Sequence, residues 1–304
     1  MNERDQNLDR LGTEAEPDGL VGLDLMTTTA LVELMNREDT LVPGAVARAR
    51  DQIALAIDGI VDRLTGGGRL IYVGAGSSGR LAMLDASECG PTFDSGPEQI
   101  QTVLAGGETV MMNASEEIED DAEAGAADLS ARSVSAHDAV LGISASGRTP
   151  YVLGALQQAV AENALIIGLV CNPSSPIVRL VDLPIEIVTG PEVIGGSTRL
   201  KAGTAQKLVL NMISTITMVR LGRTFGNLMV GVRCSNEKQR FRARRIIRLA
   251  SGCTEEEAYR ALEAAKGETK IAILMVLTGD NFATAAERLE HHDGYLRSSL
   301  GQDT

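Results

Sequence analysis

The sequence predicts an α/β protein: a five-stranded, doubly wound parallel sheet with N-terminal helices and a small C-terminal helical domain. Three observations predict this fold. Five short runs rich in Val, Ile and Leu do not alternate with polar residues, as expected for strands buried on both faces. Helical periodicity separates these runs, and strand–helix alternation is typical of parallel pairing. Beyond about residue 223 no convincing strand pattern appears.

The N-terminal part divides into a polar stretch and a helical one. Residues 1–20 are polar and charged, so we expect a flexible N-terminus. Apolar periodicity then predicts helices over 26–37 and 44–65, and we assign 21–59 to an N-terminal helical segment. Three consecutive glycines, 66–68, end the second helix.

The central domain, assigned to 60–223, holds the predicted sheet. The apolar runs predict strands over 69–73, 100–104, 139–143, 165–170 and 184–188. A helix is expected over 150–162, and a long helix over 199–220 closes the domain. Ligands of such sheets bind at the carboxyl ends of the strands.

The C-terminal domain is assigned to 224–304. Helices are expected over 236–250, 254–266, 268–277 and 281–290. The stretch 271–277 is apolar enough to be read as a strand as well. Thr254 and Glu257 have the spacing of a capping box, which marks a helix start.

Composition excludes several functional classes. The chain has 304 residues and a net charge of −13, which disfavours binding to nucleic acids and anionic membranes. Aromatic residues make up 3% and Trp is absent, which argues against base-stacking platforms. No run approaches the roughly 18 apolar residues of a membrane span. Four cysteines without CxxC spacing predict a reduced, cytoplasmic protein. The three histidines do not form a metal-ligand array with them, so no metal site is expected.

Two loops rich in glycine and hydroxyl groups follow two of the predicted strands. The first covers 74–80 and the second 144–150, each where a helix begins. Backbone N–H groups and the helix dipole favour a phosphate at such a position. The sequence therefore predicts a pocket for a small phosphorylated molecule. The residues expected to contact it are Gly76, Ser77, Ser78, Ser144, Ser146 and Thr149.

The first loop also matches the GxGxxG pattern of dinucleotide sites, through Gly74, Gly76 and Gly79. The following strand lacks an acidic residue for a ribose, and the second loop has no role in that pattern. Dinucleotide binding is therefore disfavoured. A purely structural tight turn is an alternative for either loop alone, but a poor one for both.

A third segment precedes the long helix and carries polar groups that suit a sugar. We expect Glu192 to hold sugar hydroxyls, and Ser197 and Thr198 to contact either these hydroxyls or the phosphate. Arg199 and Lys201 either contribute positive charge there or are solvated residues of the first helical turn.

Several stretches resemble the sugar isomerase (SIS) fold and, within it, the N-acetylmuramic acid 6-phosphate etherase family. The resemblance covers about 22–300, and its most specific part is Asp-Ala-Ser-Glu-Cys at 85–89. One departure is Gly90-Pro91, where the family more often has two prolines. The other matching stretches are Gly66–Gly76, Ser78–Leu81, Ser144–Pro150, Lys201–Lys207 and Phe225–Val230.

The resemblance implies cleavage of the lactyl ether by elimination and water addition, without a metal or redox cofactor. It implies Glu88 as proton donor to the departing lactate and Glu119 as the base at C2. Small apolar neighbours lead us to expect that Glu88 is buried with a raised pKa, with an exposed helix-end charge as the alternative. Glu119 lies in an acidic run that would otherwise be read as a solvated face, and a slip to Glu116 is conceivable.

The resemblance further implies a homodimer, a phosphosugar substrate and a C-terminal domain of the UBA-like type. His291 and His292 are expected to be structural or surface residues, with ring opening by one of them from a partner subunit left open. Two other functions stay in view: an aldose–ketose isomerase on the same fold, and a noncatalytic sensor such as the glucokinase regulatory protein. The presence of Glu88 and Glu119 argues against the sensor.

Overall fold

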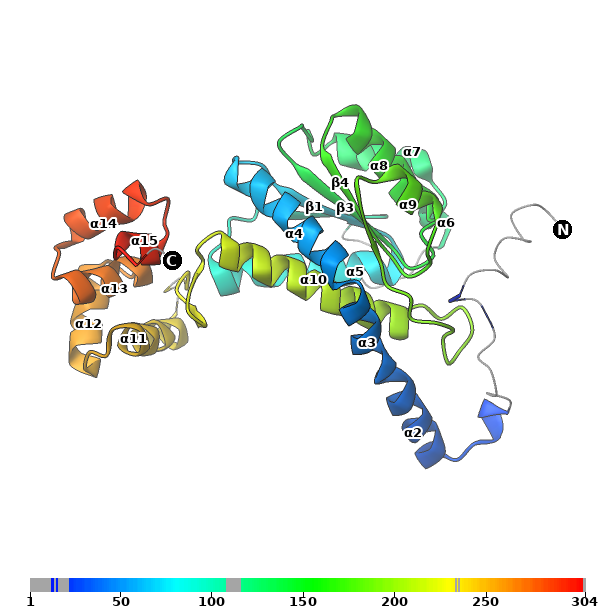
Figure 1. Cartoon of the computed structure of the whole chain (residues 1–304), viewed down its shortest axis with the longest axis horizontal. Coiled ribbons are helices and arrows are strands. Elements are labelled where there is room, and N and C mark those ends of the chain that lie inside the picture. Colours follow the sequence, from blue (N-terminus) through cyan, green and yellow to red (C-terminus); the bar gives the residue numbers. More distant parts are fainter. Residues whose placement is uncertain are drawn as a thin grey trace. The chain divides into compact units, whose positions relative to one another are not determined.

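The computed structural model describes residues 12–13, 15, 22–107, 116–232, 234 and 236–302 (Figure 1). The chain forms two compact units. One comprises Met1–Ala86 and Glu98–Ser214, and the other comprises Ser87–Pro97 and Thr215–Thr304. The predicted flexible N-terminus, 1–20, lies outside the described residues except for Gly12, Thr13 and Ala15.

The first unit contains a five-stranded parallel sheet in the order β2-β1-β3-β4-β5. The predicted strands are confirmed to within two residues at each end. Every residue of β1 is buried, which explains why its sequence is an unbroken apolar run. The strands are β1 (Leu70–Gly74), β2 (Ile100–Leu104), β3 (Ala139–Ser144), β4 (Leu165–Val170) and β5 (Leu183–Glu186).

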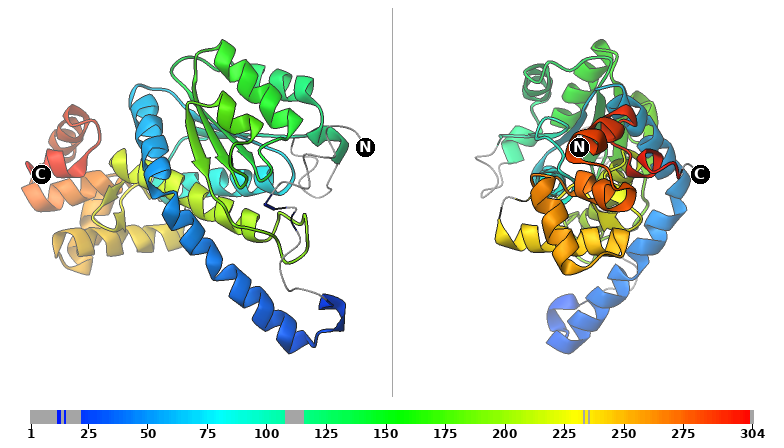
Figure 2. Two further views of the ribbon diagram at one scale, coloured as in Figure 1. Left: turned by 45° about the vertical axis from the view of Figure 1, so that its right-hand side comes forward. Right: turned by 90° about the vertical axis from the view of Figure 1, so that its left-hand side faces the viewer.

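Helices cover both faces of this sheet, as the doubly wound prediction requires (Figure 2). Ile71 and Val73 point to one face and join a buried cluster with α8. Tyr72, between them in β1, points to the other face and reaches Asp85 of α5. The first face carries α7 (Ala122–Ser130), α8 (Pro150–Ala161) and α9 (Pro176–Leu180); the second carries α4 (Arg50–Thr65) and the first-unit parts of α5 (Gly76–Phe93) and α10 (Lys201–Arg220).

The N-terminal helices are three rather than the two expected. A short η1 turn (Leu23–Leu25) precedes α2 (Thr28–Asp39), which the Thr27 side chain caps by accepting from the backbone N–H of Ala30. The chain then forms α3 (Leu41–Arg48) and α4, which are separated at Ala49 because its backbone leaves helical geometry.

The second unit is mainly helical and has its own buried core, centred on residues such as Ile247 and Ile273. All four predicted helices are confirmed, and the ambiguous stretch 271–277 is helical. Thr254 and Glu257 form the predicted capping box. The helices are α11 (Glu237–Ser251), α12 (Glu255–Ala264), α13 (Thr269–Thr278), α14 (Phe282–His291) and the short α15 (Leu296–Ser299).

One expectation for this region is wrong. A small antiparallel hairpin pairs β6 (Thr224–Phe225) with β7 (Leu228–Met229), although no strand was expected beyond 223. Strands of two residues are too short to give a periodic sequence pattern.

Candidate functional site

The two predicted loops lie at the point where the strand order of the sheet reverses. After β1 the chain crosses to β2 on one side, and β3 lies on the other side of β1. Gly74 at the end of β1 pairs in register with Ile143 of β3, so the loops that follow are neighbours. In doubly wound sheets this switch point forms the crevice in which ligands bind.

The first loop is a tight turn directly into α5. A β-carbon added at Gly74 would lie 2.8 Å from the Cα of Gly79, so the strand end and the first helical turn require glycine there. Ser77 and Ser78 occupy the first turn of α5. Unpaired N–H groups and the helix dipole make this turn favourable for an anion.

Glu119 lies at this same turn. It ends the short helix α6 (Glu116–Glu119), whose Ile118 packs against the buried cluster beneath α8. A β-carbon built on Gly76 would lie 2.5 Å from the Glu119 Oε1 atom, and Gly76 has a positive φ of 51°. The structure therefore places the predicted second glutamate beside the first loop. The alternative, Glu116, has a side chain outside the described part of the chain.

The second loop gathers its three predicted hydroxyl groups around Ser144. The Ser144 Oγ atom is 2.8 Å from Thr149 Oγ1 and 3.3 Å from Ser146 Oγ. Ser144 and Ser146 also accept hydrogen bonds from the backbone N–H groups of Gly147 and Arg148. Because each hydroxyl can both donate and accept, this cluster can reorient its protons toward a phosphate.

Gln206 is a polar residue of the site to which sequence reasoning gave no role. It lies on α10, is only 1% exposed, and accepts a hydrogen bond from Ser78 Oγ through Oε1 at 2.9 Å. Its amide nitrogen is buried and has no hydrogen-bond partner among the described residues. Ser78 thus contacts a residue 128 positions away in sequence.

The third predicted segment anchors the start of α10. Glu192 is fully buried, and its two carboxylate oxygens accept from the N–H groups of Lys201 and Ala202, each at 2.9 Å. Lys201 is also buried and pairs with Glu38 of α2 at 2.7 Å. Lys201 is therefore not a solvated first-turn residue, whereas Arg199 is exposed.

Ser197 and Thr198 lie in the turn before α10 and are partly exposed. The backbone N–H groups of the two residues donate to Ile194 and Gly196. Their predicted role in contacting the sugar hydroxyls or the phosphate stays a prediction, whereas the fully buried Glu192 exposes no surface to a sugar in this structure.

Glu88 lies on α5 in the second unit and is exposed, so the expectation that its neighbours bury it is wrong. The reason is helical geometry. Leu84 is four residues earlier on the same face and is itself 55% exposed, whereas Ala82 and Cys89 face the interior. The apolar composition around Glu88 therefore does not describe its own face of the helix.

Asp85, in the same specific motif, is buried and accepts three side-chain hydrogen bonds. The donors are Tyr72 of β1 at 3.0 Å, Asn211 of α10 at 2.7 Å and Ser214 of α10 at 3.0 Å. Burial raises the pKa of Asp85 and the three donors oppose that shift. Asp85 thus ties α5 to the strand and helix on either side of it, one turn before Glu88.

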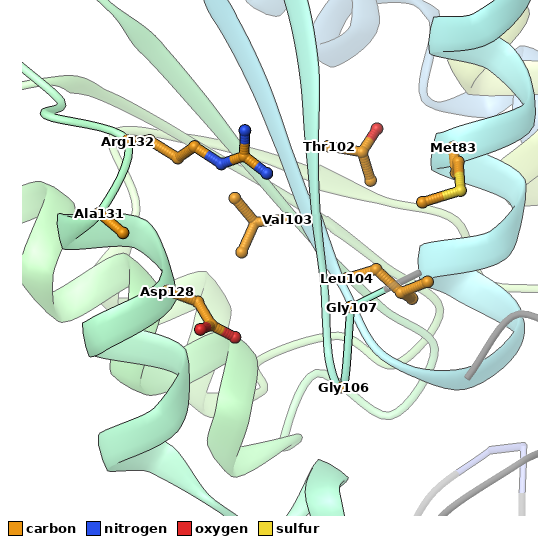
Figure 3. Close-up of a pocket in the computed structure, with 9 residues that line it drawn as sticks. All are labelled: Met83, Thr102, Val103, Leu104, Gly106, Gly107, Asp128, Ala131 and Arg132. Atoms are coloured by element: carbon orange, nitrogen blue, oxygen red, sulfur yellow. The ribbon is translucent and has the colours of Figure 1, made fainter. Parts of the chain in front are cut away.

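One cavity of the first unit lies away from these loops. It has a volume of about 580 Å³ and lies along the outer edge of β2, between α5 and α7 (Figure 3). Its lining residues include Thr102 and Arg132. None of the predicted site residues lines it. It therefore does not mark the phosphosugar site.

Within the described ranges, no three His, Cys, Asp or Glu side chains gather closely enough to hold a metal ion. In the same part of the chain, no helix is both long enough and apolar enough to cross a membrane. All four cysteines are free.

Comparison with known proteins gives consistent results. The model of the glucokinase regulatory protein N-terminal SIS domain matches residues 52–160, and the SIS domain model matches 111–216. An N-acetylmuramic acid 6-phosphate etherase of Streptomyces avermitilis is 54% identical over 96% of this chain and 94% of its own length. The protein of that name from Rubrobacter xylanophilus is 55% identical over 98% of each chain.

Among solved structures, a phosphoheptose isomerase from Francisella tularensis has a TM-score of 0.53 at 18% identity. The match covers 64% of this chain and 100% of the isomerase chain. At this identity the likeness concerns the fold alone, and it agrees with the parallel sheet described above.

Proposed function

Because this chain belongs to the N-acetylmuramic acid 6-phosphate etherase family, we propose that it cleaves the D-lactyl ether of N-acetylmuramic acid 6-phosphate. The products are N-acetylglucosamine 6-phosphate and D-lactate, and the step belongs to amino sugar recycling or catabolism. The reaction is a carbon–oxygen lyase reaction followed by hydration. The structural observation that carries the proposal is the position of Glu119 against the first hydroxyl-rich loop, at the switch point of the sheet where the second loop is its neighbour.

The geometry suggests how the substrate is oriented. Glu119 brings a carboxylate to the first loop, where it would repel a nearby phosphate dianion. The second loop offers the clustered hydroxyls of Ser144, Ser146 and Thr149. We therefore place the phosphate mainly on the second loop, with Ser77 and Ser78 contacting it from the first. The sugar carbons then lie toward Glu119.

The chemistry needs a base and an acid. In the open-chain sugar, the C1 carbonyl acidifies the C2 proton, and Glu119 removes it. The C3–O bond then breaks, and Glu88 protonates the departing ether oxygen, which leaves as the hydroxyl of D-lactate. Water adds across the new C2=C3 bond, giving its hydroxyl to C3 and a proton to C2. Two carboxyl groups held in opposite protonation states are sufficient for these transfers.

We further propose a homodimer in which a second copy of the chain covers the face of α5 that carries Glu88. Glu88 is exposed beside the exposed Leu84, and covering this face of α5 by a second copy would desolvate both. The free cysteines are consistent with the reducing cytoplasm, where we place the protein.

The test is incubation of the purified protein with N-acetylmuramic acid 6-phosphate and measurement of D-lactate. Absence of D-lactate from well-folded protein would refute the function. Glu88→Ala should abolish cleavage and still exchange the C2 proton with solvent deuterium. Loss of both cleavage and exchange in a well-folded Glu88→Ala variant would instead assign the role of base to Glu88. Conversion of N-acetylglucosamine 6-phosphate to a ketose would instead identify an isomerase.

A further inference from the structure

Thr13, in the stretch expected to be flexible, is buried at the carboxyl edge of the sheet. It is only 1% exposed. Its backbone N–H donates to the Oδ1 atom of Asn172 at 3.4 Å, and its hydroxyl oxygen accepts from the Asn172 Nδ2 group at 2.9 Å. Asn172 lies 159 residues away, two residues beyond the end of β4. This contact is therefore specific to the folded chain.

Asn172 also makes a hydrogen bond to the second loop. Its Nδ2 group also donates to the carbonyl oxygen of Ala145 at 2.9 Å, between the two predicted phosphate-binding serines of that loop. Asn172 is itself 1% exposed. A primary amide has two N–H donors and one carbonyl acceptor, so Thr13 and Ala145 together occupy both donors and engage the acceptor.

Thr13 also contacts the third segment. Its carbonyl oxygen accepts from the backbone N–H of Gly196 at 3.4 Å, next to Ser197. One residue near the N-terminus thus connects the second loop, through Asn172, with the segment that carries Ser197 and Thr198. These two pieces of chain are those to which sequence reasoning assigned the phosphate and the sugar hydroxyls.

We propose that Thr13 is a positioning residue of the phosphosugar site, which holds the second loop and the third segment in register with each other through Asn172. This inference rests on the proposed function for the identity of the substrate. Without the Thr13 hydroxyl, one Asn172 donor is buried without a partner, and the amide can rotate away from Ala145. The second loop would then lose the restraint that fixes its backbone.

The test compares Thr13→Val with Thr27→Val. Both replace a threonine hydroxyl with a methyl group, and both hydroxyl oxygens accept one hydrogen bond. Thr27 caps α2, away from the predicted site residues. We expect Thr13→Val to raise the KM for the phosphosugar about fivefold, the equivalent of one hydrogen bond, with kcat within twofold of wild type. Thr27→Val should leave KM unchanged, and Thr13→Ser should restore it.

A double-mutant cycle tests whether Thr13 acts through Asn172. The shift in melting temperature caused by inorganic phosphate tests the proposal independently of the proposed function. Combining Thr13→Val with Asn172→Ala should cost no more than Asn172→Ala alone, because both act through one contact. The rise in melting temperature caused by inorganic phosphate should shrink in Thr13→Val and persist in Thr27→Val, whether or not the wild type releases lactate. Equal KM values and equal phosphate shifts in the two valine variants would overturn the proposal.

Discussion

Replacing Gly76 by Ala tests whether Glu119 must lie against the first loop. The added β-carbon would lie 2.5 Å from Glu119 Oε1, whereas ordinary contacts begin at 3.4 Å, so the carboxylate must retreat by 3.4 − 2.5 = 0.9 Å. A displacement of about 1 Å at a reacting group can cost about 100-fold in rate. The positive φ of 51° adds roughly 1 kcal/mol of backbone strain for alanine. We therefore expect kcat/KM for lactate release to fall about 100-fold.

Gly67→Ala is the matched control. Gly67 has a positive φ of 83°, and no atom lies within 4 Å of its added β-carbon. We therefore expect the Gly67→Ala variant to lose a similar free energy of unfolding and to retain full activity. Steady-state D-lactate release and thermal unfolding of both variants provide the comparison. The reasoning fails if Gly76→Ala keeps more than half of the wild-type rate while it loses as much stability as Gly67→Ala.

Three further predictions concern the contacts around the site and the sheet. Gln206→Met should raise KM about fivefold with kcat unchanged, because Ser78 loses its acceptor; an unchanged KM in a steady-state assay would contradict this. Asp138 is buried, which by itself would raise its pKa, but hydrogen bonds from Arg69 and Ser135 hold that pKa below the ordinary 3.8. Asp138→Asn should therefore cost about 3 kcal/mol in urea unfolding at pH 7, a difference that disappears as the pH falls through the lowered pKa. The pKa of Asp85 is shifted in the opposite direction, because burial raises it. The free energy of unfolding of the wild type should therefore decline as the pH rises from 3.8 through the raised value. Asp85→Asn should flatten this pH dependence, which urea unfolding at several pH values would measure.

The strands were predictable because each is a short apolar run buried on both faces. The hairpin β6–β7 was not, since two-residue strands leave no pattern. The exposure of Glu88 was predictable in principle, because Leu84 and Glu88 are four residues apart and share one face of α5, whereas Ala82 and Cys89 lie on its buried side. The error shows that apolar neighbours in sequence are neighbours in space only at helical spacing.

The sequence alone does not predict the long-range contacts of the site. Nothing local to Gln206 indicates Ser78, and nothing local to Thr13 indicates Asn172, because each pair is brought together only by the complete sheet. The polar composition before residue 21 predicts a stretch that does not build its own core. It gives no sign that Thr13 is buried by polar contacts with loops far along the chain.

The Asp85 contacts set the order in which the protein can be completed during synthesis. Asn211, one of the donors to Asp85, lies 126 residues later in the chain. At translation rates of about 5 to 20 residues per second, the wait is about 6 to 25 s. During that interval Asp85 can accept a hydrogen bond from Tyr72 of β1 but lacks both of its α10 donors, so its burial is incompletely compensated. Packing of α5 onto the sheet should therefore be delayed until α10 emerges from the ribosome, which makes α10 the element that completes the first unit.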